Sequence, residues 1–238
     1  MTLRERLTSG EPAIGLWASI PSPLTAEAAA LAGPDYVVVD QQHGAVAPDV
    51  LLGMLQAIAA GGVPSLVRVA RNEPFTIGHA LDLGAAGVIV PMVEDGEQAA
   101  RAVAACGYAP EGVRSFGALR SGGGEPLCLV MIETRAGLER AEEIAATPGL
   151  DGIYVGPSDL SLSLGLQPTI RLKHPPVLVA IERVREACGR HGIVAGLHCL
   201  AAEDVPERAG SFAMVTAGGD MLHLQGALAA ALRAARGG

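Results

Sequence analysis

Aromatic residues and lysine are both scarce in this chain of 238 residues. Phe, Trp and Tyr make up only 3% of the sequence, although half of all residues are hydrophobic. The core therefore has to be built from Ala, Val, Leu and Ile, which suits an α/β protein. Lys173 is the single lysine and lies between prolines, well beyond the sixth predicted strand. Because imine-forming enzymes need an amine at the active site, this covalent chemistry is disfavoured.

Basic residues are outnumbered, and long apolar runs are missing. Lys and Arg number 17 against 25 Asp and Glu, for a net charge of −8. The sequence has no cluster of basic residues that could bind along the phosphate backbone of a nucleic acid, so we expect no nucleic-acid partner. No apolar stretch approaches the roughly 18 residues of a membrane span, and the first residues lack a signal-peptide core. We expect a soluble homo-oligomer without membrane contacts, because the high hydrophobic content fits buried strands plus subunit contacts.

The four cysteines form no Cys-x-x-Cys pair. This spacing argues against a zinc site, a redox dithiol and a secreted disulfide framework. We therefore expect reduced thiols in a cytoplasmic protein. The cysteines are Cys106, Cys128, Cys188 and Cys199.

Short β-rich runs alternate with Ala- and Leu-rich stretches of helical spacing. The alternation is typical of βα units around a parallel sheet, and eight near-equal units predict a (β/α)8 TIM barrel as one domain over residues 1–238. An open doubly wound sheet is the alternative. The predicted strands are 14–18, 36–39, 65–69, 87–90, 127–132, 152–155, 193–197 and 212–215, and the predicted helices are 24–32, 49–60, 75–84, 96–105, 137–146, 176–190, 201–208 and 220–235.

Two acidic residues follow neighbouring predicted strands. In a barrel of this type the active site lies at the carboxyl ends of the strands. Two carboxylates there make a hard oxygen site suited to Mg²⁺ or Mn²⁺, which keep positions open for water or substrate. We predict Glu133 and Asp159 as the metal ligands. The structural alternative pairs Glu133 with Arg135 and makes Asp159 the N-cap of a helix starting at Leu160.

A histidine and an arginine are expected at the same end of the barrel. His43 directly follows the second strand and is a candidate general acid or base, with Asp40 to orient its ring. A loop histidine held by a backbone carbonyl is the alternative. Arg68 points inward and needs a carboxylate, either from the substrate or from Asp40 or Asp82. His198 follows the seventh strand without a nearby acid and is a secondary candidate.

Two backbone segments are candidate anion sites. The N–H of Ser158 could donate to a ligand carboxylate, whereas Pro157 has no donor. Gly218 and Gly219, ahead of the last predicted helix, occupy a position that often binds anions in barrels. The alternative for this second segment is that Asp220 simply caps the helix.

Several short motifs occur in order along almost the whole chain. Together they resemble the metal-dependent class II pyruvate aldolases of the HpcH/HpaI type, which include 4-hydroxy-2-oxoheptanedioate aldolase. The motifs are GLW at 15–17, DQQHG at 40–44, VRV at 67–69, LDLGA at 81–85, VPMV at 90–93, RSFG at 114–117, IET at 132–134, GPSDLS at 156–161 and TAGGD at 216–220.

The resemblance implies an activity, a metal and an assembly. It implies cleavage and formation of 4-hydroxy-2-oxoacids through a pyruvate enolate, with a divalent ion (Mg²⁺, Mn²⁺ or Co²⁺) bound by Glu133 and Asp159. It also implies a hexamer built as a trimer of dimers, in which the last helix is exchanged between partners.

The resemblance further assigns roles to individual residues. Arg68 corresponds to the arginine that holds the pyruvate oxygen and stabilises the enolate. His43 corresponds to the proton-transferring histidine, which works with acids at Asp40 and Asp82. The backbone near Pro157 and Ser158 is expected to hold the pyruvate carboxylate.

The sequence departs from the family pattern in two places. Gln42, which we count among the substrate-binding residues, stands where the family often has Glu, so one negative charge near the base is missing. The segment from Arg120 to Cys128 is shortened in comparison with many members. Since this region helps to wall the aldehyde side of the site, the identity of the aldehyde does not follow from the resemblance.

Two other functions compete with the aldolase. One is a citrate-lyase-like or citrate-forming enzyme that acts on oxaloacetate or a CoA thioester through the same enolate chemistry. The other is a barrel that binds a dicarboxylate without turnover.

Overall fold

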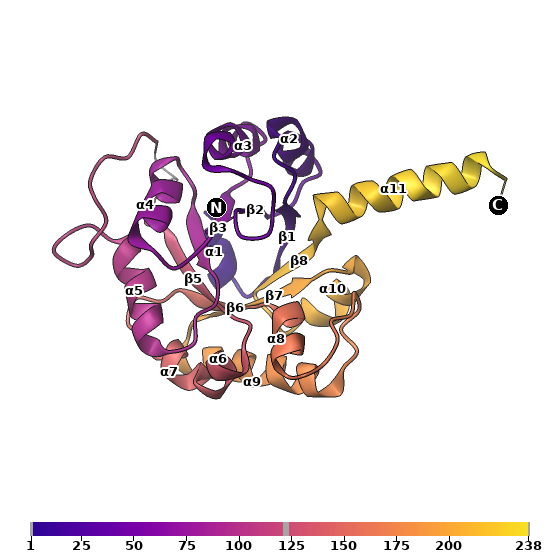
Figure 1. Ribbon diagram of the computed structural model, residues 1–238. Coiled ribbons are helices and arrows are strands. Elements are labelled where there is room, and N and C mark those ends of the chain that lie inside the picture. The colour runs from indigo at the N-terminus through magenta and orange to yellow at the C-terminus, as the bar shows by residue number, and fades with distance from the viewer. Residues whose placement is uncertain (1, 121–123, 238) are drawn as a thin grey trace.

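Eight parallel strands close into a barrel in sequence order. The computed structural model describes residues 2–120 and 124–237, and each strand pairs with its sequence neighbours, with β8 returning to β1 (Figure 1). The predicted (β/α)8 barrel is confirmed, and the open doubly wound sheet is wrong. The strands are β1 (Ala13–Ala18), β2 (Tyr36–Asp40), β3 (Ser65–Arg68), β4 (Gly87–Val90), β5 (Leu127–Ile132), β6 (Gly152–Val155), β7 (Val194–Cys199) and β8 (Met214–Gly219).

The strands are buried on both faces. Every residue of β2, β3, β4, β5 and β6 is buried, as expected for parallel strands between a filled barrel interior and a layer of helices. Strands β4, β5 and β6 have the predicted bounds. Strands β7 and β8 run past the predicted ends at Leu197 and Val215, because backbone pairing continues where the side chains become polar. The extension places His198 and Thr216 on neighbouring strands.

The helices mostly follow the predicted ranges, with three differences. The predicted helix 137–146 is split at Arg140, and the range 201–208 begins with a 3-10 turn. The short helix α1 was missed, and α8 was expected only in the alternative that starts a helix at Leu160. The helices are α1 (Leu3–Thr8), α2 (Pro23–Leu31), α3 (Pro48–Ala60), α4 (Pro74–Asp82), α5 (Gly96–Cys106), α6 (Arg135–Glu139), α7 (Ala141–Ala145), α8 (Pro157–Ser163), α9 (Pro175–His191), η1 (Ala202–Asp204), α10 (Val205–Arg208) and α11 (Asp220–Ala235).

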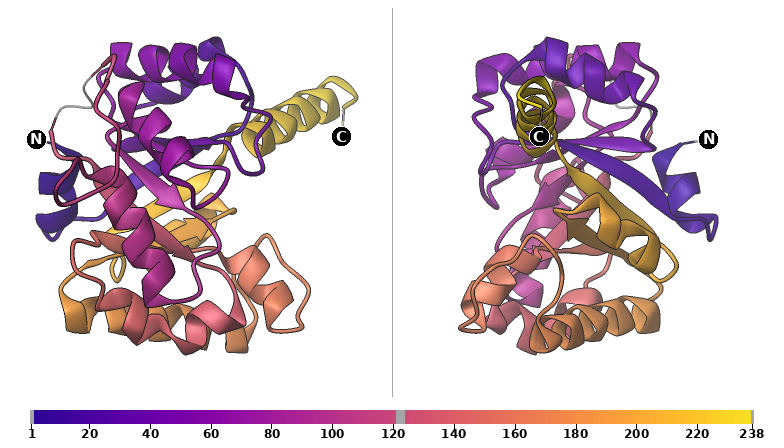
Figure 2. Two further views of the ribbon diagram at one scale, coloured as in Figure 1. Left: turned by 60° about the vertical axis from the view of Figure 1, so that its left-hand side comes forward. Right: turned by 90° about the vertical axis from the view of Figure 1, so that its right-hand side faces the viewer.

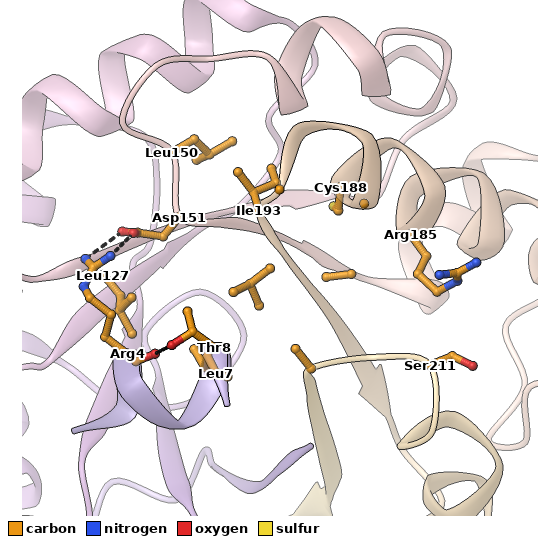
Figure 3. Close-up of a pocket in the computed structure, with 15 residues that line it drawn as sticks. Arg4, Leu7, Thr8, Leu127, Leu150, Asp151, Arg185, Cys188, Ile193 and Ser211 are labelled. Carbon is orange, nitrogen blue, oxygen red and sulfur yellow. Dashed lines mark hydrogen bonds and ion pairs between the residues drawn. The ribbon is translucent and has the colours of Figure 1, made fainter. Parts of the chain in front are cut away.

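Helix α1 closes the amino-terminal end of the barrel. Leu3 and Leu7 are 5% exposed and belong to the apolar cluster that fills the barrel interior. Arg4 forms an ion pair with Asp151, just before β6 (Figure 3). It also donates a hydrogen bond to the carbonyl of Pro126. Helix α1 therefore covers the amino-terminal end of the barrel interior.

Helix α11 has the predicted bounds but lies apart from the barrel. None of its residues is buried, and it extends outward from the end of β8, on the side opposite α1 (Figures 1 and 2). Its exposed large apolar residues are Met221, Leu222, Leu224, Leu228 and Leu232. Among the described helices, none combines the length and apolar character needed to cross a bilayer.

Candidate active site

Asp40 and Arg68 meet at the carboxyl ends of β2 and β3. The two residues are partners in the strand register, and both Asp40 oxygens accept hydrogen bonds from Arg68, from Nε at 2.8 Å and from Nη2 at 2.6 Å. Both side chains are buried. Of the alternatives for the Arg68 partner, the structure selects Asp40 and excludes Asp82. The bidentate pair fixes the plane of the guanidinium.

Trp17 of β1 lies under this ion pair. The Arg68 guanidinium carbon is 5.0 Å from the centre of the indole ring, a cation–π distance. Burial raises the pKa of Asp40, but the hydrogen bonds and positive charge of Arg68 outweigh it, so the pKa lies below its ordinary value. Asp40 is therefore a carboxylate at neutral pH, and Arg68 keeps its outer N–H groups for a ligand. In the sequence, Trp17 stands out only as part of the GLW motif.

Asp40 also shapes the loop that carries His43. One of its oxygens accepts the backbone N–H groups of Gln42 at 3.0 Å and of His43 at 3.3 Å. The prediction that Asp40 orients the His43 ring is therefore wrong in its detail, because the bond goes to the backbone, and the exposed ring has no hydrogen-bond partner among the described residues. Gln42 is half-buried, and its side-chain oxygen has no hydrogen-bond partner among the described residues.

Glu133 lies at the end of β5 as a buried, half-satisfied carboxylate. Its Oε1 accepts the Met92 N–H at 2.8 Å, whereas Oε2 is buried and lacks a hydrogen-bond partner in the described part of the chain. Burial raises the pKa of Glu133, and the neighbouring negative charge of Asp159 raises it further. The alternative pairing of Glu133 with Arg135 is not found among the described ion pairs. A buried carboxylate oxygen without a partner requires a cation or a proton.

Two backbone features accommodate the Glu133 side chain, one by donating a hydrogen bond and the other by leaving space. Met92 has a φ of 58°, rare for a side chain of this size, and this turn aims its N–H at Glu133. At Gly156, an added Cβ would lie 2.8 Å from the free Oε2 of Glu133. Neither residue was recognisable as functional from the sequence. The VPMV and GPSDLS motifs contained them, but only the structure shows which atoms they serve.

Helix α8 places Asp159 beside Glu133. Gly156 is the N-cap and Pro157 the first helical residue, so Asp159 lies inside the first turn. The alternative of Asp159 as the N-cap of a helix starting at Leu160 is wrong. The half-buried Ser158 also lies in this first turn, where a helical N–H has no carbonyl four residues earlier to bind. The segment thus offers backbone donors next to the two acids.

The two acids fit a hard divalent cation. Within the described ranges no three His, Cys, Asp or Glu residues form a metal-binding group, so the protein supplies two carboxylates at most. Magnesium and manganese accept this number, because they keep several coordination positions for water and substrate oxygens. The unpartnered Oε2 of Glu133, the nearby charge of Asp159 and the space at Gly156 all suit such an ion.

Asp82 lies away from these residues. It ends α4, shortly before β4 begins, and its carboxylate accepts two hydrogen bonds from Arg114, at 3.1 Å and 2.6 Å. Its carbonyl accepts the N–H groups of Leu119 and Arg120. The structure therefore does not bring Asp82 to His43 of the same chain. Asp82 anchors the loop between α5 and β5, of which residues 121–123 fall outside the described ranges.

The polar groups around the start of α11 form hydrogen bonds within the protein. Asp220 is the first residue of α11 rather than its cap, and its carboxylate accepts the N–H groups of Ser19 and Ile20, both at 3.0 Å. His223 bonds to the carbonyl of Ala217 at 2.6 Å and would contact a Cβ at Gly218. The structure does not support an anion site here.

A cavity of about 540 Å³ lies at the opposite end of the barrel (Figure 3). Its charged residues already have partners: Arg4 pairs with Asp151, and Arg185 pairs with Glu182. Its carboxylate, Asp151, is held by Arg4, and burial raises the pKa of the Cys188 thiol to about 12, so the candidate site is the one at the carboxyl ends of the strands.

Comparison with known proteins decides the family. A family model described as HpcH/HpaI aldolase/citrate lyase matches residues 13–225. The chain belongs to this family. The resemblance drawn from the motifs is confirmed, and with it the classification of the chain as a carbon–carbon lyase.

Three individual relatives illustrate the similarity. A hydroxypyruvate/pyruvate aldolase of Rhizorhabdus wittichii is 39% identical over 201 residues, which cover 80% of each chain. A 5-keto-4-deoxy-D-glucarate aldolase of Klebsiella pneumoniae is 36% identical over 204 residues, covering 80% of this chain and 79% of the relative. The crystal structure of a family protein from Burkholderia cenocepacia superposes with a TM-score of 0.90 at 33% identity and covers 98% of both chains.

Proposed function

We propose that the protein is a metal-dependent aldolase that cleaves 4-hydroxy-2-oxoacids to pyruvate and an aldehyde, and also catalyses the reverse addition. The observation that carries the proposal is the buried, unpartnered Oε2 of Glu133, close to the charge of Asp159 and within the electrostatic influence of Arg68. Two acids and an oriented arginine suit a bound 2-oxoacid, in which carboxylate and ketone oxygens lie side by side. The names of the relatives support this substrate class.

Glu133 and Asp159 would hold the cation, which we expect to be Mg²⁺, Mn²⁺ or Co²⁺. When bound, such an ion withdraws electrons from the ketone of the 2-oxoacid and so favours charge on its oxygen. Ser158, next to Pro157, donates its backbone N–H to the substrate carboxylate, and Gln42 lines the same site with its unpartnered oxygen.

Arg68 stabilises the negative charge that develops in the reaction. As the C3–C4 bond breaks, its electron pair moves onto the pyruvate fragment, and the ketone oxygen becomes an enolate oxygen. The guanidinium is held in place by Asp40 before substrate arrives, so it needs no reorganisation as the charge forms.

His43 is the proposed route for the protons. It removes the proton of the 4-hydroxyl group, directly or through a water, and the aldehyde carbonyl forms. A proton is then returned to C3 to complete pyruvate. An exposed ring on a loop fixed by Asp40 can exchange protons with solvent between these steps. The proposed part of Asp82 in this transfer requires Asp82 of another copy, since its own chain holds it elsewhere.

A substrate panel tests the proposed function. The purified protein, loaded with each of the three metals in turn, is given several 4-hydroxy-2-oxoacids, and pyruvate release is followed with lactate dehydrogenase. We expect release with at least one substrate and none after chelation. Oxaloacetate and acetyl-CoA are tested separately. Turnover of these compounds alone would replace the aldolase with the citrate-type enzyme that shares the family.

Helix α11 supports a proposed homo-oligomer. Its large apolar residues are exposed in the described part of the chain, and an exposed helix of this kind is expected to pack against another subunit. We propose the hexamer, a trimer of dimers with exchanged α11, as the assembly. Leu228→Asp with Leu232→Asp should reduce the mass measured by light scattering, whereas Arg236→Glu, just beyond the helix, should leave it unchanged.

The thiols fit the proposed cytoplasmic location. All four cysteines are free and buried, and burial raises the pKa of Cys188 and of Cys199 to about 12. They remain unreactive thiols, as expected in a reducing compartment.

A further inference from the structure

A cavity of about 310 Å³ opens beside the Arg68 guanidinium. It lies between the ends of β1, β7 and β8 and the start of α11. Glu133 and Asp159 do not line it, so it extends from the proposed keto-acid position toward α11. Its polar lining residues are Ser19, Asp40, Arg68, His198, Asp220 and Gln225. A substrate fragment attached to the keto acid would enter this space.

His198 faces this cavity with a fixed ring. It lies on β7, and its Nδ1 is 3.0 Å from the hydroxyl oxygen of Thr216 on β8. Trp17 meets the imidazole edge to face, with the ring centres 4.6 Å apart. The hydrogen bond and the ring contact hold the imidazole from two sides. The structure gives Nε2 no partner among residues 2–120 and 124–237, so this nitrogen is available to a ligand.

The hydroxyl of Thr216 determines which nitrogen carries the proton. Its oxygen accepts the Cys199 N–H at 3.3 Å and lies 3.1 Å from the Tyr154 hydroxyl. Because Tyr154 and Thr216 are fully buried, each hydroxyl proton needs an acceptor. The contact distances allow either hydroxyl to donate to the other; in the arrangement that we infer, Tyr154 donates to Thr216 and Thr216 donates to Nδ1 of His198. In this arrangement the proton of the neutral ring is on Nε2, which points a donor at the cavity.

His198 stays neutral at cellular pH. Burial lowers the pKa of His198 to about 4, and the positive charge of Arg68 contributes to the lowering. Unlike an imidazolium, a neutral imidazole next to Arg68 does not attract a second carboxylate. It instead suits an uncharged oxygen, such as a hydroxyl group.

We propose that His198 determines the aldehyde specificity of the enzyme, by donating a hydrogen bond from Nε2–H to a hydroxyl oxygen on the aldehyde part of the substrate. The inference rests on the proposed function and adds to it the substrate class: 4-hydroxy-2-oxoacids whose aldehyde fragment carries a further hydroxyl. His198 takes no part in breaking the carbon–carbon bond.

Glycolaldehyde and acetaldehyde form a matched test, since they differ by one hydroxyl group. Their addition to pyruvate is measured with the wild type, with His198→Phe and with His198→Gln, which keeps an N–H donor. We expect the wild type to prefer glycolaldehyde in kcat/KM. His198→Phe should lower that preference about 3- to 10-fold, the value of one neutral hydrogen bond, and His198→Gln should retain it. Deuterium exchange into the pyruvate methyl group, which needs no aldehyde, should be unchanged in both variants.

Equal losses with the two aldehydes in His198→Phe would show a structural role and overturn the proposal. Nitrogen-15 NMR of histidine-labelled wild type gives a readout that needs no turnover. We expect the Nε2–H tautomer, with an Nε2 shift that moves on adding glycolaldehyde but not acetaldehyde. An Nδ1–H tautomer, or no response to glycolaldehyde, contradicts the proposal. If neither pyruvate exchange nor aldol addition occurs in the wild type, the proposed function fails, and the NMR titration still decides the role of His198.

Discussion

Asp40 and Arg68 stand opposite each other at the ends of β2 and β3, and two hydrogen bonds of 2.8 Å and 2.6 Å join their side chains. The pair is buried over the indole of Trp17. One end of the arginine is therefore committed to the protein, and the other is presented to a ligand in a fixed plane. This arrangement makes Arg68 both a structural and a functional residue.

Removing one member of this pair should destabilise the fold. Arg68→Met leaves the Asp40 carboxylate buried without a counterion, and we expect the free energy of unfolding to fall by about 3–5 kcal/mol. The double variant Arg68→Met, Asp40→Leu should recover most of this loss. Urea unfolding measures all three proteins. Glu97→Gln, which breaks an exposed ion pair with Arg101, serves as the control and should change little. A double variant as unstable as the single one would show that charge burial is not the cause.

Gly156 should be essential for cation binding. In Gly156→Ala the new Cβ would stand 2.8 Å from Oε2 of Glu133 and displace the carboxylate. We expect the affinity for Mn²⁺, measured by electron paramagnetic resonance titration, to fall about 10- to 100-fold, as when supporting groups of a metal ligand are disturbed. Gly189→Ala on α9 is the matched control, because its Cβ would meet nothing within 4 Å. Equal affinities in both variants would refute the assignment of Glu133.

His43 should be needed for proton transfer but not for folding or for metal binding. Its ring is exposed, so His43→Ala should fold normally and bind Mn²⁺ like the wild type. Deuterium exchange into the pyruvate methyl group, followed by NMR, should slow by roughly 10²-fold or more. His191→Ala, on the distant end of α9, is the control for loss of an imidazole. Unchanged exchange in His43→Ala would assign the proton transfer to another group.

Stability should depend on pH through His198. Its pKa is about 4 in the folded protein and about 6.5 when unfolded, so the unfolded chain binds the proton first as the pH falls. The stability present above pH 6.5 is therefore lost progressively toward pH 4, by about 3 kcal/mol in total. Denaturant unfolding across this window measures it. His198→Phe should flatten the dependence, and an unchanged slope would mean that other groups cause it.

The sequence predicted the barrel well because its parallel strands are buried on both faces and read as apolar runs between helical stretches. The runs at β4, β5 and β6 gave the correct bounds. Helix α1 was missed because six residues show no clear period. Strand β7 was cut short because His198 interrupts the apolar pattern, although the backbone ladder continues to Cys199.

The site was predicted in part. Residues at strand ends are placed by the fold, and this is why Asp40, Arg68, Glu133 and Asp159 lie near one another as expected. Their hydrogen bonds were not predictable: the φ of Met92, which turns an N–H toward Glu133, depends on tertiary structure. Asp82 shows that a motif does not tell which copy of the chain supplies a residue, since within its own chain Asp82 pairs with Arg114, away from His43.

The most direct test of the account is deuterium exchange into the methyl group of pyruvate in D₂O, with the metal as the variable. The wild type, Glu133→Gln and Asp159→Asn are each stripped with EDTA, dialysed and assayed before and after Mn²⁺ is returned. We predict no exchange in the stripped wild type, full recovery with Mn²⁺, and no recovery in either variant. Exchange that continues in the stripped enzyme, or that Mn²⁺ restores in both variants, would contradict a cation held by Glu133 and Asp159.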